Sequence, residues 1–258
     1  MERHGLTFIV AVNDENILQR NLFSSPLFAS KGKYQIIERH GCNSATIAYN
    51  EAIKKAENDI IVFTHQDMYF PESWIYELER ALNYLEDIDP CWGVLGCYGR
   101  KKGINHGIGR VYTAGIGLNG SVIHKPEAID TLDEIVIIIR KSSGLSFDSS
   151  LPHFHLYGTD ICMLARDRGL SNYSIPAYCI HNADLYINLP KEFYECYYHV
   201  KKKWKKFLPI HASCIKITRF DSEVKLRKLK IMIKKILGKS VSGKIKTSVK
   251  NPRTLIDK

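Results

Sequence analysis

The sequence predicts an α/β protein built on a doubly wound, mostly parallel sheet that is flanked by helices and followed by a basic, helical C-terminal extension. Two observations carry this prediction. Apolar, strand-like segments alternate four times with segments of helical periodicity within the first hundred residues, which is the pattern of a parallel sheet with crossover connections. The positive charge of the chain is concentrated in its last quarter, which separates a tail from the rest.

The expected strands are short apolar runs, and the helices between them show apolar residues at helical spacing. Turn formers and helix-breaking residues separate the two kinds of segment. Asn43 or Ser44 is expected to cap the second helix, and Pro71 suits the first turn of the third. The strands are expected at 6–12, 34–37, 60–65, 92–98, 135–139 and 173–180, and the helices at 15–23, 45–56, 71–85 and from 158 or 159 onward.

The segment Ile60-Ile61-Val62-Phe63-Thr64-His65-Gln66-Asp67 is the centre of the prediction. Its apolar part does not alternate with polar residues, which suits a central strand buried on both faces. In open α/β sheets, ligands bind beyond the carboxyl ends of the strands. The motif therefore puts an imidazole and a carboxylate where a phosphorylated substrate and its metal would lie. Taken alone, the tripeptide fits equally well a carboxylate that only caps the following helix.

Several classes of protein are disfavoured by what the sequence lacks. No Gly-x-Gly-x-x-Gly follows the first strand and no Gly-x-x-x-x-Gly-Lys-Ser/Thr occurs, which removes most support for dinucleotide and P-loop sites. The seven cysteines are odd in number and form no Cys-x-x-Cys pair, which favours reduced thiols, a cytosolic protein and no structural zinc. No apolar segment approaches the length of a membrane span, and the first five residues lead straight into a strand instead of a signal-peptide core.

The order of three motifs resembles a family 2-type glycosyltransferase of the GT-A fold. These motifs are a first strand ending in Asn13-Asp14, the segment Asn43-Ser-Ala-Thr-Ile-Ala-Tyr-Asn50-Glu-Ala-Ile-Lys-Lys-Ala, and the strand that ends in His65-Gln66-Asp67. The usual Asp-x-Asp is replaced by His-x-Asp, a form that resembles a bacterial branch of the superfamily. The resemblance covers roughly residues 6–185 and implies a nucleotide-sugar transferase that uses Mn²⁺ or Mg²⁺.

The resemblance also assigns the metal ligands and the base. Asp67 matches the acid that holds a divalent cation on the donor diphosphate, and His181 matches the histidine that completes the metal site. Asp160, at the start of a helix, matches the general base on the acceptor hydroxyl. We expect its proton-accepting oxygen to face the crevice that holds Asp67, free of permanent partners. By spacing alone, a helix-capping acid is the more common interpretation of Asp160, and a histidine at a strand end is more often a surface residue.

The donor and the acceptor are expected on either side of these groups. Residues at the same edge of the sheet, or at the start of a helix there, are expected to bind the nucleotide: Asn13, Glu38, Asn43 and His65. In the resembled family the region around residues 133–134 faces the acceptor, so Asp133, Glu134 and His155 are candidate acceptor contacts. The two acids equally fit a solvated turn. Residues 99–120, rich in glycine and cations, fit either a mobile flap or a plain hairpin.

The reaction that these residues permit is single displacement with inversion. The nucleoside diphosphate leaves as an anion, and one carboxylate takes the proton of the attacking acceptor hydroxyl. No second carboxylate is placed as a nucleophile or as the partner acid of a hydrolase. The Gln-x-x-Arg-Trp pattern of processive polysaccharide synthases is absent, which favours transfer of one sugar to a glycan or lipid-linked acceptor.

The tail differs in charge from the rest of the chain. Residues 191–258 contain 20 Lys and Arg against 5 Asp and Glu, a net charge of +15, whereas residues 1–190 carry −5. We therefore expect a transferase domain over 1–190 and a basic, helical extension over 191–258 that is mobile beyond Ser240. Residues 224–237 form an amphipathic basic helix, which fits either an anionic membrane surface on the cytoplasmic side or packing on the catalytic domain.

Two rival classes remain open. A non-enzymatic protein that binds nucleic acid or membranes would use the basic tail, but it leaves the His-Gln-Asp motif unexplained, so no nucleic acid is expected as a partner. A nucleotidyltransferase has a related sheet and also uses metal. It would be expected to carry a glycine-rich Arg/Lys signature after the first strand, where this chain has Asn13-Asp14-Glu15.

Overall fold

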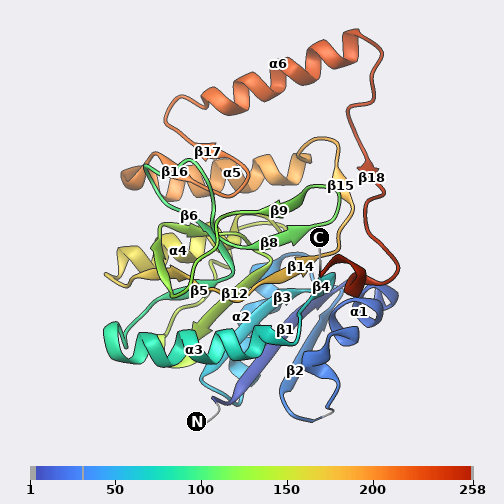
Figure 1. Ribbon diagram of the computed structural model, residues 1–258. Coiled ribbons are helices and arrows are strands. Elements are labelled where there is room, and N and C mark those ends of the chain that lie inside the picture. The colour runs from blue at the N-terminus through green and yellow to red at the C-terminus, as the bar shows by residue number, and fades with distance from the viewer. Residues whose placement is uncertain (1–3, 31, 257–258) are drawn as a thin grey trace.

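A seven-stranded mixed sheet with strand order β10-β13-β5-β12-β3-β1-β2 forms the centre of the molecule in the computed structural model, which describes residues 4–30 and 32–256 (Figure 1). Strands β2, β1, β3, β5 and β13 run in one direction, and β12 and β10 run in the other. The bounds are β1 Leu6–Val12, β2 Gln35–His40, β3 Ile60–His65, β5 Val94–Gly96, β10 Glu127–Ile129, β12 Val136–Arg140 and β13 Asn172–Ser174. The expected mostly parallel α/β fold is therefore confirmed.

Strand β3 is central, as its continuous apolar run predicts. Its side chains alternate between two hydrophobic cores: Ile61 and Phe63 belong to one, Ile60 and Val62 to the other. The first core is covered by α2 (Ala45–Lys55) and α4 (Tyr157–Asp167), and the second by α1 (Glu15–Arg20) and α3 (Ser73–Ile88). Ser44, not Asn43, caps α2, because its Oγ accepts the N–H of Ile47 at 3.3 Å. The sheet is thus a middle layer with helices on both faces.

The direction of β12 was not predicted from the sequence. It pairs antiparallel with both β3 and β5. A parallel neighbour needs a crossover connection, usually a helix. The chain between β5 and β12 instead forms short strands: β6 Tyr98–Arg100, β7 Ile108–Gly109, β8 Val111–Thr113, β9 Gly117–Asn119 and β11 Thr131–Leu132. The glycine-rich segment is therefore built of hairpins, and Gly109 is required there because a Cβ would lie 2.2 Å from the carbonyl oxygen of Cys97.

Two expected strands are each divided between two sheets. The segment 92–98 supplies β5 and the start of β6, and 173–180 supplies β13 and β14 (Cys179–His181). Pro176 separates the latter two, since proline cannot donate to a strand ladder. Strand β14 joins a second, four-stranded sheet of order β4-β14-β8-β9, in which β4 is Met68–Tyr69. This second sheet matters because its β4 follows directly on the His-Gln-Asp motif.

The chain after residue 190 does not begin as a separate unit. Helix α5 (Lys191–Lys203) buries Phe193, Tyr197 and Val200 in the same core as α2 and α4, and this core extends to Val224. The expected division at residue 190 is therefore not reflected in the packing. The remaining elements are β15 Leu185–Tyr186, β16 Ile210–His211, β17 Lys216–Ile217, α6 Ser222–Ile236, β18 Lys244–Ile245 and the 3₁₀ helices 22–24, 26–28, 141–143, 205–207 and 252–255.

Helix α6 projects from the body of the molecule, and the chain then returns to it (Figure 1). The apolar residues of its stripe, from Leu226 to Leu237, are 46–77% exposed, so most of the stripe does not pack on the catalytic domain, and Leu226 lines a pocket with Leu189 and Tyr194. The return segment is fastened by β18, which pairs with β15, and by Leu255, which is buried. The described residues beyond Ser240, up to 256, therefore contact the body of the molecule at these two points. Within the described part of the chain, no helix is long and apolar enough to cross a membrane, and all seven cysteines are free thiols.

Candidate metal and nucleotide site

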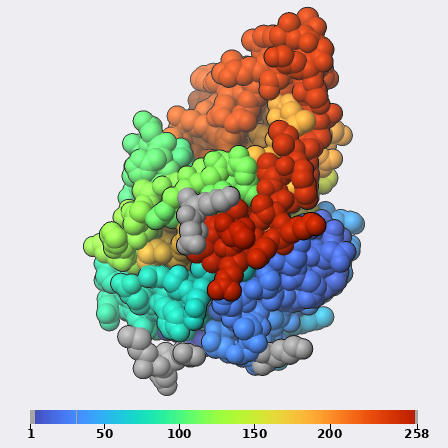
Figure 2. Space-filling model, turned by 45° about the vertical axis from the view of Figure 1, so that its right-hand side comes forward, coloured from blue at the N-terminus to red at the C-terminus, as the bar shows by residue number. Residues whose placement is uncertain are grey.

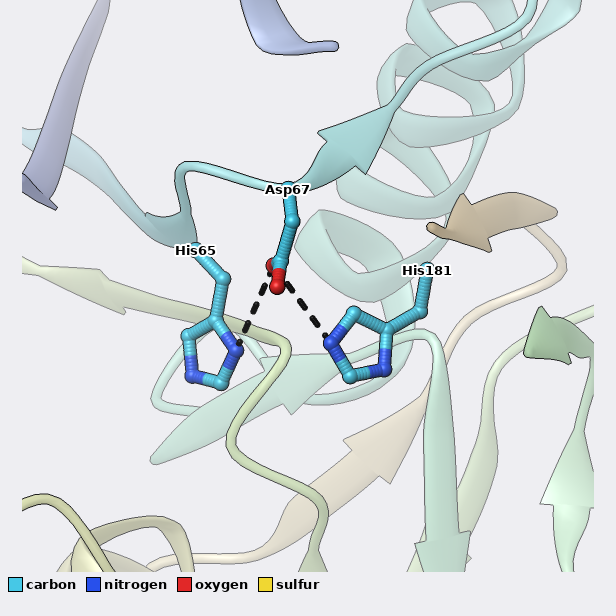
Figure 3. A group of neighbouring side chains, drawn as sticks. All are labelled: His65, Asp67 and His181. Atoms are coloured by element: carbon cyan, nitrogen blue, oxygen red, sulfur yellow. Dashed lines mark ion pairs between the residues drawn. The ribbon is translucent and has the colours of Figure 1, made fainter. Parts of the chain in front are cut away.

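Three side chains from two sheets converge at the carboxyl end of β3: His65, Asp67 and His181 (Figure 3). His65 is the last residue of β3, and Asp67 lies in the turn that leads into β4. His181 ends β14 and is paired with Met68 of β4. The backbone N–H of Asn182 also donates to the carbonyl oxygen of Asp67 at 2.9 Å. The pairing of β4 with β14 is thus what brings His181 to the motif.

The hydrogen bonds of Tyr157 determine which nitrogen of His65 is free. The Tyr157 hydroxyl donates to the carbonyl oxygen of Glu134 at 3.1 Å and lies 2.8 Å from His65 Nε2. Because its single proton is used, it accepts from Nε2–H. The lone pair of His65 is therefore on Nδ1, which lies 3.9 Å from Asp67 Oδ1. A second partner that fixes the tautomer of an imidazole in this way is typical of a metal-ligating histidine.

The charges of the two histidines keep the side chain of Asp67 in its ionised, carboxylate form. Burial by itself would raise the pKa of Asp67, but His181 and His65 outweigh it and hold this pKa well below its usual range. Burial likewise opposes the charged form of His181, yet the neighbouring Asp67 raises the pKa of that imidazole. His181 Nε2 lies 3.4 Å from Asp67 Oδ1. Asp67 Oδ1 is buried and has no hydrogen-bond partner among the described residues.

A divalent cation fits this arrangement. The one carboxylate oxygen and two imidazole nitrogens lie within 4.8 Å of one another, and Asp67 Oδ1, which accepts no hydrogen bond from the described residues, would gain a ligand bond. A set of two imidazoles and one carboxylate suits transition metals better than Mg²⁺, which prefers oxygen ligands and keeps several waters. His65, expected to contact the nucleotide, is therefore better placed as a third ligand.

The residues expected to bind the nucleotide lie along the same edge of the sheet. Asn13 follows β1, Glu38 lies near the end of β2 and Asn43 precedes α2, and all three are exposed. Gln66, which the sequence did not single out, joins this edge to the motif. Its Oε1 accepts the N–H of Asn13 at 2.9 Å, and its Nε2 donates to Asn13 Oδ1 at 2.6 Å.

The expected acceptor residues lie near the three converging side chains. Burial lowers the pKa of His65 and opposes the charged form of His181, and the negative charge of Asp133 acts in the opposite direction on both. The segment of Asp133 passes beside His65, because the backbone N–H of His65 donates to the carbonyl oxygen of Ile135 at 3.4 Å. Burial raises the pKa of Glu134 well above its usual value, although hydrogen bonds from the backbone N–H groups of Leu156 and Gly158 act in the opposite direction. Burial, with a contribution from His65, lowers the pKa of His155 to about 4.

The structure contradicts the expected surroundings of Asp160. It does lie in the first turn of α4, but its side chain is only 2% exposed. Oδ2 accepts from Lys203 Nζ at 2.8 Å, and Oδ1 accepts from Trp204 Nε1 at 2.6 Å. Burial raises its pKa, which Lys203 and Trp204 partly offset. The carboxylate is therefore not free of permanent partners, because the end of α5 covers the start of α4.

Three residues at or near the site have little signal in the sequence. Tyr157 immediately precedes the Gly158-Thr159-Asp160 segment, and only its place at the start of a helix near the other candidates pointed to it. Lys203 and Trp204 lie in a run of lysines and aromatic residues that resembles a solvated surface. Their contact with Asp160 spans more than 40 residues and depends on how α5 packs.

Comparisons with known proteins found both related sequences and similar folds. A search of curated proteins found the ATP synthase subunits region ORF 6 of Fuscovulum blasticum, 22% identical over 168 residues, which cover 62% of this chain and 66% of that protein. Among solved structures, GalNAc-T7 with UDP, GalNAc and Mn²⁺ superposes with a TM-score of 0.56 at 9% identity, covering 78% of this chain and 48% of that one. S. aureus TarS gives a TM-score of 0.48 at 16% identity, covering 82% of this chain and 40% of that one.

The chain thus spans about half the length of GalNAc-T7 and just under two thirds of the curated relative. The likeness to GalNAc-T7 shows a shared fold. The family follows from the sequence itself, because the model of the glycosyltransferase-like family matches residues 7–202. These residues include all three converging side chains. This chain therefore belongs to the glycosyltransferase-like family, with the GT-A type of fold.

Proposed function

We propose that this protein is a metal-dependent glycosyltransferase that moves one sugar from a nucleoside-diphosphate sugar to a hydroxyl group of a glycan or lipid-linked acceptor. The observation that carries the proposal is the convergence of His65, Asp67 and His181 at the carboxyl end of β3, in a chain of the glycosyltransferase-like family. This edge of an open α/β sheet is where ligands bind. A cation held there would also bind the diphosphate.

Mn²⁺ is the proposed metal, with Asp67, His65 and His181 as its ligands. Two imidazoles favour it over Mg²⁺, and the solved GalNAc-T7 structure holds Mn²⁺ together with UDP. When bound, the cation would neutralise the charge that develops on the departing diphosphate. Tyr157 holds His65 so that Nδ1 faces Asp67. Asn13, Glu38 and Asn43 are proposed to hydrogen-bond the nucleotide along the same edge.

Asp133 is the proposed general base, with inversion at the anomeric carbon. It belongs to the segment beside His65, whose backbone N–H donates to the carbonyl oxygen of Ile135 at 3.4 Å, and its own Oδ1 accepts the backbone N–H of Ile135 at 3.3 Å. Glu134 is the second candidate, because its carbonyl oxygen accepts from the Tyr157 hydroxyl that also bonds His65. Asp160 is the third, because it would first have to be released by Lys203 and Trp204. His155 is proposed to contact the acceptor.

Helix α6 is the proposed contact with an anionic membrane surface, on the cytoplasmic side. Leu226, Leu229, Ile233 and Ile236 recur at helical spacing and are exposed. Val224 is buried in the core and lies on the opposite side of the helix by the same spacing. Leu229, Ile233 and Ile236 are thus free to contact a lipid surface, and the lysines around them suit the headgroups of anionic lipids.

A screen of nucleotide-sugars tests the proposed function. The full-length protein is incubated with UDP-, GDP- and other nucleotide-linked sugars in Mn²⁺ or Mg²⁺, and release of the nucleoside diphosphate is measured. We expect release with one nucleotide class, stronger with Mn²⁺ and abolished by a chelator. Release of pyrophosphate from a sugar phosphate and a nucleoside triphosphate would instead identify a nucleotidyltransferase.

A further inference from the structure

The last part of the chain returns to the sheet that carries two of the proposed metal ligands. We call residues 244–256 the C-terminal strap. It begins with β18, which pairs with β15, and ends with the 3₁₀ helix Pro252–Leu255. Figure 2 shows this segment, in dark red, lying against the blue N-terminal elements and the green segment that contains β8 and β9. It lies beyond residue 202, where the family model ends.

Asn182 joins the strap to the turn that holds Asp67. Its side chain is buried, accepts the N–H of Val249 at 2.8 Å and donates to the carbonyl oxygen of Val249 at 2.8 Å. It also donates to Asn21 Oδ1 at 2.7 Å. Its own backbone N–H is the one that donates to Asp67. A single residue next to His181 thus connects the strap, the end of α1 and the Asp67 turn.

Apolar side chains of the strap pack on one face of strands β4 and β14. Leu255 is buried with Tyr69 of β4, Ile180 of β14 and Ala114. Tyr69 and Ile180 are paired across the two strands. Because successive strand residues point to opposite faces, Ile180 faces the strap and His181 faces the other way. The strap therefore covers the face of the β4–β14 pair opposite to the His181 side chain.

The strap also makes close polar and steric contacts with the loops around it. Asp184 Oδ1 accepts the backbone N–H groups of Thr247 and Ser248 at 3.1 and 3.0 Å. Gly115, with φ +80°, lies against the strap, and a Cβ there would be 2.4 Å from Thr247 Cγ2. These contacts specify one position of the strap on the sheet.

We propose that the C-terminal strap is a positioning element of the metal site. The β4–β14 pair, which sets His181 against Asp67, is only two residues long, and β14 is held on its other side by β8. The strap bonds Asn182 and packs on Tyr69 and Ile180, and so holds this short pair in register. The inference depends on one part of the proposed function, namely that His65, Asp67 and His181 bind a divalent cation.

Binding of Mn²⁺ alone to the full-length protein tests the strap, with the free ion counted by electron paramagnetic resonance. Loss of a group that orients metal ligands typically weakens metal binding ~10–100-fold. We expect about tenfold weaker binding in Leu255→Ala and in Asn182→Ala. In the double variant, Mn²⁺ affinity should fall by less than the product of the two single factors, because both substitutions act through the strap. Leu255→Met, which refills the cluster, should restore binding.

Lys250→Ala is the matched control, because Lys250 is an exposed strap residue, and it should bind as the wild type does. Circular dichroism and melting curves establish that each variant is folded. If Leu255→Ala does not fold, Val249→Ala, a smaller truncation in the same cluster, replaces it. Wild-type affinity in folded variants overturns the strap inference and leaves the proposed function intact. Absence of Mn²⁺ binding in the wild type overturns both.

Discussion

Trp204 Nε1 donates a hydrogen bond of 2.6 Å to Asp160 Oδ1, although 44 residues separate the two in the sequence. Lys203 Nζ takes the other carboxylate oxygen at 2.8 Å, so this acid joins α4 to the end of α5. Lys203 also pairs with Asp148 at 2.7 Å. The residue that resembles a general base by its position is thus part of a partly buried ionic network.

Substitution of Asp160 should affect stability more than chemistry. Asp160→Ala leaves Trp204 and Lys203 without their partner. We expect it to cost about 2–3 kcal/mol of unfolding free energy, below the range for fully buried pairs because Lys203 is 26% exposed. Asp160→Asn keeps an acceptor and should cost less, about 1 kcal/mol. Denaturant unfolding measures both.

Measurement of turnover distinguishes a structural role of Asp160 from the role of a general base. Asp133→Asn should reduce turnover ~10²–10⁴-fold if Asp133 is the general base, while folded Asp160→Asn retains turnover within about tenfold. Asp167→Asn is the control, since its partner Lys206 is a surface residue. The assignment to Asp133 fails if folded Asp160→Asn loses turnover by the larger factor and Asp133→Asn does not.

Removal of the proposed metal ligands should act in a definite order. Asp67→Ala should abolish the Mn²⁺-dependent binding of a nucleoside diphosphate, because it removes the only anionic ligand of the proposed set. His65→Ala and His181→Ala should weaken this binding, since water replaces an imidazole more easily than a carboxylate. Calorimetry with Mn²⁺ and with Mg²⁺ measures the order. His124→Ala, an exposed histidine, should change nothing, and unaltered binding in Asp67→Ala would refute the metal site.

Substitutions at the nucleotide edge should act mainly on donor binding. Glu38→Ala and Asn43→Ala each remove one exposed polar group and should raise the donor KM roughly tenfold with little change in kcat. Asn13→Ala should affect both constants, because Asn13 also bonds Gln66 of the motif. Steady-state kinetics at saturating acceptor gives the two constants separately. A loss confined to kcat at Glu38 and Asn43 would put the nucleotide elsewhere.

Charge on the stripe of α6 should release the protein from anionic vesicles. Leu229 and Ile233 are 48% and 46% exposed, so Leu229→Glu with Ile233→Glu places two acids on the apolar face without disturbing the core. We expect loss of co-sedimentation with anionic vesicles, and weaker wild-type binding as salt is added. Ile88→Glu, at an exposed position of α3, is the control. Equal sedimentation of all three proteins would exclude α6 as the membrane contact.

The sequence by itself determined the elements whose signal is local. The continuous apolar run 60–64 specified a strand buried on both faces, and the spacing of apolar residues specified α2 and α3. The end of β3 also made Asp67 a candidate ligand, because ligands of open α/β sheets bind beyond the carboxyl ends of the strands, and the family resemblance favoured that role over a helix cap. These features depend on residues a few positions apart, and such periodicities survive in almost any tertiary context.

Only the tertiary structure decided which distant groups meet. The antiparallel direction of β12, the contact of Tyr157 with His65 and the burial of Asp160 under α5 each join segments far apart in the chain. The physical reason is that a hydrogen bond or a desolvated charge depends on the register of packed elements to within an ångström, whereas the sequence pattern specifies only which face of each element is apolar. The strap is the clearest case, because its return to Asn182 depends on packing that no local pattern in residues 244–256 encodes.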